Sequence, residues 1–90
     1  MATVTEVLKA ATDSVTLIDG VKAGSFDTTG MTQAEINEMV QRNVDHISII
    51  LEYAPVDSDD DTPNVKGSSA DKSSYTGAIT TGNKYIKDNS

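Results

Sequence analysis

The sequence contains no cysteine and no tryptophan, and it has only one phenylalanine, three tyrosines and one histidine. Without cysteine no disulfide can brace the fold, and with a single histidine a structural zinc site is excluded as well. Aromatic side chains bury the most area each, so their scarcity leaves this 90-residue chain with a modest core. We therefore expect one small domain at most, whose stability depends on helix packing or on assembly.

Basic residues are also scarce, and the formal net charge is −7. Residues 1–51 hold seven acids and three bases, residues 52–65 five acids and no base, and residues 66–90 two acids and four bases. An acidic chain without a basic cluster does not favour nucleic acid or anionic membranes as partners. No apolar run approaches the length of a membrane span, and the start MATVTEV has no signal-peptide features. These features predict a soluble protein made inside a cell.

The strongest pattern in the chain lies over residues 31–54. Thr32 and Glu35 form a T-x-x-E capping box, in which each side chain satisfies a backbone donor of the first helical turn. The helix should begin near Gln33. Pro55 disfavours helical dihedrals at the residue before it, so the helix should stop at about Tyr53.

The apolar residues of this helix recur at three- and four-residue spacing and therefore share one face. They are Ile36, Met39, Val40, Val44, Ile47, Ile50, Leu51 and Ala54. Burial of this face cannot by itself offset the entropy of ordering the helix, so the face needs partners from this chain or from another. Asn43 lies on or near the same face. We interpret it as bonding a neighbouring loop backbone, with a role in setting register within an oligomer as the alternative.

An earlier apolar stripe predicts a first helix, which a second possible capping box at residues 3–6 would open and a C′ glycine at Gly20 would close after Asp19. A strand at residues 14–18 is the competing interpretation, because Val, Thr and Ile favour pleated surfaces. The unbroken stripe favours the helix. Residues 21–30 have a loop composition that lets the chain turn back, and Phe26 should pin this loop onto the core. An antiparallel helical hairpin over residues 1–54 follows.

Residues 55–74 read as an acidic, solvated linker with few apolar residues. Residues 75–90 then fit a helix with Ser73 or Ser74 as its cap, or a hairpin that turns at residues 81–82; the helix is favoured. In a helix, the small residues Gly77, Ala78 and Gly82 would let this segment approach another backbone closely. The segment would then act as a docking element.

Candidate sites for chemistry are few. Asp57, Asp59 and Asp61 have the spacing that opens an EF-hand loop, but the residues at its sixth, seventh and twelfth positions do not fit; they are Thr62, Pro63 and Ser68. A hydrated acidic loop is favoured, with an unspecific divalent-ion site as the alternative. His46 lies beside Asp45, but neighbouring helical residues point in different directions, so the pair is no catalytic dyad. We expect no cofactor, no metal and no enzymatic activity.

Two segments carry a resemblance. Residues 31–53 read MTQAEINEMVQRNVDHISIILEY and residues 75–86 read YTGAITTGNKYI. The first resembles a helix with an N-V-x-H-I/L centre, and the second a terminal segment ending G-x-x-Y-I, as in small virion proteins of tailed bacteriophages. Together they cover more than a third of the chain. The resemblance implies a copy-rich, non-enzymatic component of a capsid, neck or tail, and it carries over no functional residue.

The sequence thus predicts an all-α protein with a helical hairpin (1–54), an acidic linker (55–74) and a C-terminal docking element (75–90). Its function would be attachment through protein–protein contacts in a larger assembly, with further copies or capsid and tail proteins as partners and the virion as its location. A regulatory module that binds calcium, or one that binds a basic protein surface, is the alternative. The predicted interface residues are Ile36, Val40, Asn43, Val44, Ile47, Leu51, Tyr75, Ile79, Tyr85 and Ile86.

Overall fold

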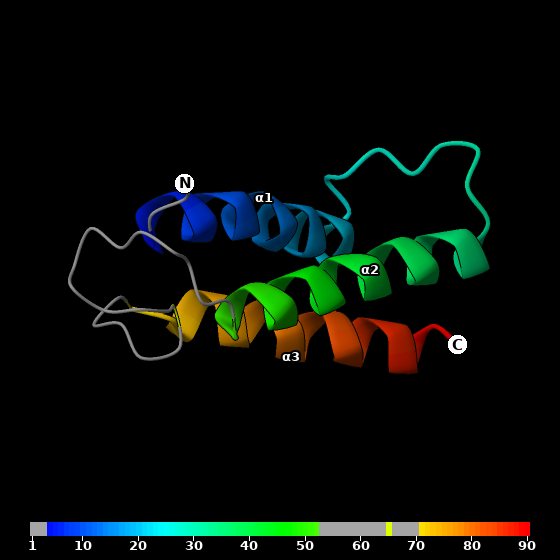
Figure 1. Ribbon diagram of the computed structural model, residues 1–90. Coiled ribbons are helices and arrows are strands. Elements are labelled where there is room, and N and C mark those ends of the chain that lie inside the picture. The colour runs from blue at the N-terminus through cyan, green and yellow to red at the C-terminus, as the bar shows by residue number, and fades with distance from the viewer. Residues whose placement is uncertain (1–3, 53–64, 66–70) are drawn as a thin grey trace.

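The structure is a computed structural model of the 90-residue chain, and it describes residues 4–52, 65 and 71–90. These residues form three helices, α1 (Val4–Ala23), α2 (Gln33–Leu51) and α3 (Ser73–Asp88). No strand occurs in the described part of the chain, so the predicted all-α class is confirmed. Each helix packs on both others, and α2 runs opposite to α1 and α3 (Figure 1). The result is a three-helix bundle.

Helix α1 confirms the helical interpretation of residues 14–18, but its predicted end near Asp19 is wrong. The helix continues through Gly20 to Ala23, and Gly24 follows it in the left-handed region with φ +79°. Gly20 instead receives the returning loop, because its carbonyl accepts hydrogen bonds from the backbone N–H groups of Ser25 at 2.9 Å and Phe26 at 3.1 Å. Phe26 packs against the core, as predicted. Thr3 of the possible capping box lies outside the described residues.

Helix α2 begins as predicted. The backbone N–H of Glu35 donates to the Thr32 hydroxyl at 3.1 Å, and the backbone N–H of Thr32 donates to a Glu35 carboxylate oxygen at 2.9 Å. At the other end Glu52 caps the helix, and its backbone N–H donates to the carbonyls of Ile49 and Ile50. The helix therefore ends at Leu51, two residues before the predicted end.

Helix α3 confirms the helical interpretation of the C-terminal segment, and the hairpin alternative is wrong. The predicted serine cap is also wrong. Lys72 stands at the cap position, where its side chain makes no capping hydrogen bond. The Asp71 carboxylate accepts from the backbone N–H of Ser73 at 2.9 Å and from its hydroxyl at 2.7 Å. The helix accordingly begins at Ser73, inside the stretch that was predicted to be linker.

The core lies between the three helices, and of the described residues in the connection between α2 and α3 it includes one. That residue is Val65, which is fully buried although it belongs to the predicted solvated linker. The other buried apolar residues are Val7, Leu8, Ala11, Ile18, Val21, Ile36, Val40, Val44, Ile47, Ile50 and Ala78. Among the described helices, not one combines the length and apolarity needed to cross a membrane.

Candidate functional site

The predicted interface residues divide into two groups in the structure. Four residues of α2 are buried in the bundle, where α1 and α3 cover them: Ile36, Val40, Val44 and Ile47. The other six are half-buried: Asn43, Leu51, Tyr75, Ile79, Tyr85 and Ile86. The apolar face of α2 was expected to need partners from this chain or from another, and it is largely covered by the helices of its own chain. Contact of either group with another molecule stays a prediction.

Helix α3 lies unusually close to both other helices at Gly82. A Cβ atom built on Gly82 would lie 2.5 Å from Val44 Cγ2, 3.3 Å from Val40 Cγ1 and 3.5 Å from Ile18 Cγ2. Carbon atoms pack at about 3.5 to 4.0 Å, so even a methyl group here would overlap Val44. Ala78, one turn earlier, is 3% exposed. Ala78 and Gly82 therefore permit the close approach that the sequence predicted. The same prediction is wrong for Gly77, which is exposed and has nothing within 4 Å of a Cβ built on it.

Polar contacts hold α3 in register at both ends of the bundle. Near its start, the hydroxyls of Tyr75 and of Thr12 in α1 lie 3.2 Å apart in a hydrogen bond. Near its end, the Gln33 side-chain amide of α2 donates to the Tyr85 hydroxyl at 3.1 Å. Asn37 of α2 also donates to the backbone carbonyl that follows the helix, that of Asn89, at 3.1 Å. These hydrogen bonds are exposed to solvent, so they contribute more to register than to stability.

Asn43 uses its amide inside its own helix. Its Nδ2 donates to the backbone carbonyl of Met39 at 2.8 Å, one turn earlier in α2. The interpretation that this donor bonds a neighbouring loop is therefore wrong. The amide instead bonds a carbonyl one turn earlier in its own helix, as asparagine side chains in helices can do. A role in the register of an oligomer stays a prediction.

Sequence reasoning missed one contact between α1 and α2. The Ser14 hydroxyl lies 2.9 Å from His46 Nδ1 in a hydrogen bond, and Ser14 is only 3% exposed. Ser14 continues the apolar stripe of α1, since it stands between Ala11 and Ile18 at helical spacing, and that position could have identified it as a buried hydroxyl that needs a partner.

The Ser14–His46 pair lacks the other features of a catalytic site. Its hydroxyl is enclosed by the bundle, and the neighbouring Asp45 accepts a hydrogen bond from Gln41 at 2.9 Å instead of orienting the histidine. A working nucleophile needs an accessible hydroxyl and an oriented base. The pair is therefore a hydrogen bond that links α1 to α2.

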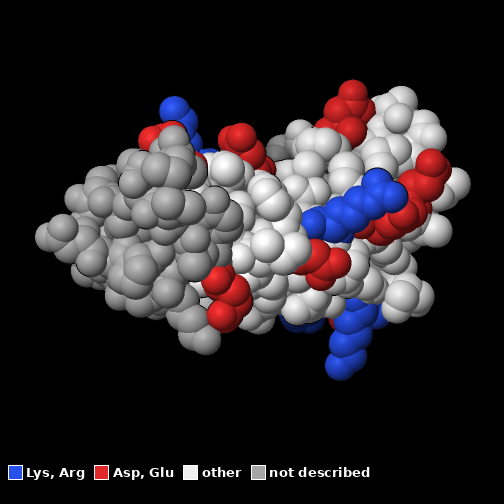
Figure 2. Space-filling model, viewed as in Figure 1, with Lys and Arg blue, Asp and Glu red and all other residues white. Residues whose placement is uncertain are grey.

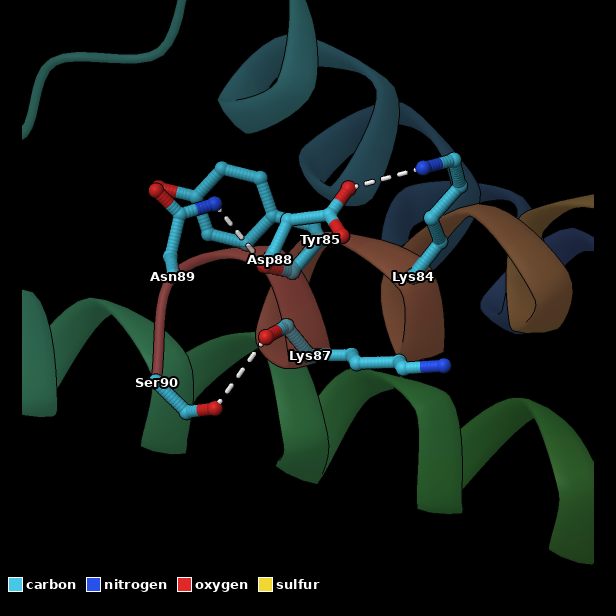
Figure 3. A network of polar contacts seen from close by, with 6 residues as sticks. All are labelled: Lys84, Tyr85, Lys87, Asp88, Asn89 and Ser90. Atoms are coloured by element: carbon cyan, nitrogen blue, oxygen red, sulfur yellow. Dashed lines mark hydrogen bonds and ion pairs between the residues drawn. The ribbon is translucent and has the colours of Figure 1, made fainter.

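A polar network closes the end of α3 (Figure 3). Lys84 Nζ pairs with an Asp88 carboxylate oxygen at 2.8 Å, and this hydrogen bond, together with the carboxylate charge, raises the pKa of Lys84. The Asn89 amide donates to the Tyr85 carbonyl at 2.8 Å, and the Ser90 hydroxyl to the Lys87 carbonyl at 3.2 Å. The Tyr85 carbonyl also accepts the backbone N–H of Asn89 at 3.1 Å, so the side chains add to the backbone hydrogen bonds at the end of the helix.

Beside this network, α1 and α3 line a hollow of about 180 Å³, formed by Lys22, Thr81, Lys84, Tyr85, Asp88 and Asn89. Its charged groups include the Lys84–Asp88 ion pair. Acidic and basic side chains are interspersed over the coloured part of the face in Figure 2. In the described part of the chain no three His, Asp or Glu side chains converge to hold a metal ion, and Asp57, Asp59 and Asp61 lie outside it.

Comparison with known proteins gives no relative: no family model, no curated protein and no solved structure matches this chain.

Proposed function

We propose that this chain is a non-enzymatic structural or attachment protein that acts through protein–protein contacts in a larger assembly. In its specific form the proposal is that the assembly is a tailed-phage virion, with the chain bound in the capsid, neck or tail. Residues 1–54 would serve as the helical hairpin and α3 as the element that docks. The resemblance of residues 31–53 and 75–86 to small phage virion proteins motivates the choice of assembly.

One observation supports the proposal most directly: five of the predicted interface residues are large apolar or aromatic residues that remain half-buried after the bundle has formed. They are Leu51, Tyr75, Ile79, Tyr85 and Ile86. Covering their remaining apolar surface with a partner would contribute roughly 25 cal/mol for each Å² removed from water. Because the bundle already holds their backbones in helices, a partner would bind them with little further ordering cost.

The experiment is to purify the particles of a phage whose genome encodes this chain and to quantify the chain in them by mass spectrometry. We expect many copies per particle. Ile86→Gln, which makes a half-buried position of α3 polar, should lower incorporation several-fold. Asn83→Gln, an exposed change on the same helix, should leave incorporation unchanged. Circular dichroism confirms that both variants remain helical.

Two results would count against the proposal. One is a chain that stays outside the particles and binds no purified capsid, neck or tail protein. The other is a melting midpoint that rises with submillimolar calcium and returns to its original value with Asp59→Ala, which would indicate the calcium-binding module instead.

A further inference from the structure

One side of α2 points away from the bundle. The buried residues of this helix share a single side, and successive helical residues are about 100° apart, so the remaining positions face solvent. We define the outer face of α2 by the six residues on that opposite side: Glu35, Glu38, Met39, Arg42, Asp45 and Ile49. Met39 is half-buried and the other five are exposed.

Ile49 is an apolar residue that the outer face leaves in water. Its side chain is 66% exposed, whereas the other large apolar side chains whose burial the structure describes are buried or half-buried. A partner that covered Ile49 would remove apolar surface from water, which favours binding. Single exposed apolar residues are common on protein surfaces, so the surroundings of Ile49 decide whether a partner fits.

A shallow hollow lies on the same face, nearer the start of α2. It has a volume of about 370 Å³ and is lined by Met31, Glu35, Glu38, Met39 and Arg42. Its two methionines are half-buried, and their unbranched, polarizable side chains adapt to the shape of a partner. A rise of about 1.5 Å per residue places Met39 about 15 Å from Ile49 along the helix. The outer face therefore offers two apolar contact points on one line.

Carboxylates surround these apolar positions. The outer face carries three acids, Glu35, Glu38 and Asp45, and one base, Arg42. Arg42 pairs with Glu38 at 2.6 Å, but the two side chains are 76% and 63% exposed. An ion pair so exposed to water contributes little, so Glu38 can accept a cation from a partner instead. The face as a whole is apolar along its line and negative around it.

This charge determines which partner fits. A second copy of the chain, a nucleic acid or an anionic membrane would each bring like charge to the outer face. Lysine and arginine have apolar stems and charged ends, so they can cover methionine side chains and reach carboxylates at once. A helix is the matching shape, because a line of about 15 Å along α2 equals about three turns of a second helix packed beside it.

We propose that the outer face of α2 binds a basic amphipathic helix of a partner protein. In the complex, apolar side chains of the partner cover Ile49 and Met39, and its lysines and arginines meet the three carboxylates of the face. This inference rests on the proposed assembly role and deepens it, since it names a surface and the chemistry of the partner.

The probe is a synthetic peptide of about 18 residues, in which a leucine stripe lies between lysines and arginines on a helix. A matched peptide carries glutamate at every basic position. Fluorescence anisotropy measures the binding of each labelled peptide to the full chain. We expect the basic peptide to bind, with an affinity that falls several-fold between about 50 mM and about 300 mM salt, and the acidic peptide not to bind.

Three variants separate this surface from the net charge of the chain. Ile49→Ser and Glu38→Lys should each weaken binding of the basic peptide several-fold. Asp19→Lys makes the same change of charge at an exposed position of α1 and should retain most of the affinity. Circular dichroism confirms that the three variants keep the wild-type helicity. Equal losses for Glu38→Lys and Asp19→Lys, or no loss for Ile49→Ser, would overturn the proposal, because binding would then follow net charge alone.

The same variants distinguish this inference from the proposed function. In purified phage particles we expect Ile49→Ser to lower incorporation several-fold. Wild-type incorporation of both Ile49→Ser and Glu38→Lys, with reduced incorporation of Ile86→Gln, would overturn the contact through the outer face and leave the proposed function intact. Absence of the wild-type chain from the particles would count against the proposed function, and the peptide measurement would still decide whether the outer face binds a basic helix.

Discussion

At the scale of single residues, two glycines of α3 have opposite surroundings, and the same substitution should act on them in opposite directions. Gly82→Ala should lower the free energy of unfolding by about 1 to 3 kcal/mol, because the new methyl group meets Val44 and the helices must move apart. Gly77→Ala should raise it by about 0.5 to 1 kcal/mol, since Gly77 is exposed within the helix and has free space around it. Urea unfolding of the two variants measures both values.

The comparison separates packing from helix propensity, because both variants gain the same preference for the helix. If Gly82→Ala were as stabilising as Gly77→Ala, the close approach of α3 to Val44 would be contradicted.

The Ser14–His46 contact makes a second residue-scale prediction. Ser14→Ala should lower the free energy of unfolding by about 0.5 to 1 kcal/mol, since it removes a hydrogen bond but adds a better helix former. His46→Ala should cost more, about 1 to 3 kcal/mol, because it leaves the buried Ser14 hydroxyl without this partner. Denaturant unfolding provides the measurement.

Ser48→Ala is the matched control, because Ser48 is exposed and bonds the carbonyl of Val44 in its own helix. Equal stability of the Ser14 and Ser48 variants would contradict a stabilising role of the Ser14–His46 hydrogen bond.

At the scale of helices, the start of α2 should depend on pH. The backbone N–H of Thr32 donates to the Glu35 carboxylate and, with the Thr32 hydroxyl, lowers the pKa of Glu35 below its ordinary value of 4.5. A carboxyl with a lowered pKa in the folded state stabilises the fold above its unfolded pKa. This contribution is lost as the pH falls through the lower, folded value.

The matched variant is Glu35→Gln, which can still accept the hydrogen bond but does not titrate. We expect the wild type to exceed this variant in stability at neutral pH, and the margin to disappear as the pH falls below 4.5. Thermal melts of both proteins from pH 7 to pH 2.5 measure this difference in stability. The other carboxyl groups titrate in both proteins, so their contributions cancel in the difference. A margin that stays constant over this range would contradict the expected titration.

The helices also show which signals in the sequence were sufficient. The start of α2 was predicted correctly, because a capping box is formed by residues three positions apart. The end of α1 was predicted wrongly because Gly20 serves the returning loop, and a contact with Phe26 is not visible from neighbouring residues. The start of α3 was missed for a similar reason, since Asp71 bonds Ser73 from two positions before the helix.

At the scale of the whole molecule, Val65 connects the bundle core to a part of the chain that looked fully solvated. It is fully buried, so Val65→Ala should lower the free energy of unfolding on the order of 1 to 3 kcal/mol. Val15→Ala, at a half-buried position, should cost less. Denaturant titration gives both values. If both variants lost the same small amount, Val65 would not belong to the core.

The buried face of α2 was predictable in its residues, but the segments that cover it were not, and contact of the candidate site with another molecule stays a prediction. The stripe of α2 correctly identified residues such as Ile36 and Ile47, because periodicity fixes which positions share a face. What covers that face depends on contacts between distant segments. Gly82 and Ala78 let α3 approach, and their small size gave no hydrophobic signal in the sequence. Val65, a single apolar residue among polar neighbours, was likewise invisible to a search for periodicity.

The two tyrosines of α3 have a practical consequence. Tyr75 reaches α1 near one end of the bundle and Tyr85 reaches α2 near the other, through their hydroxyl groups. The chain has no tryptophan and three tyrosines in total, so two of its three dominant chromophores lie on the helix whose docking matters most. Ultraviolet absorbance and tyrosine fluorescence therefore report the attachment of α3 without a label. Replacing Tyr75 or Tyr85 with phenylalanine, one at a time, assigns the optical signal to one end of the helix.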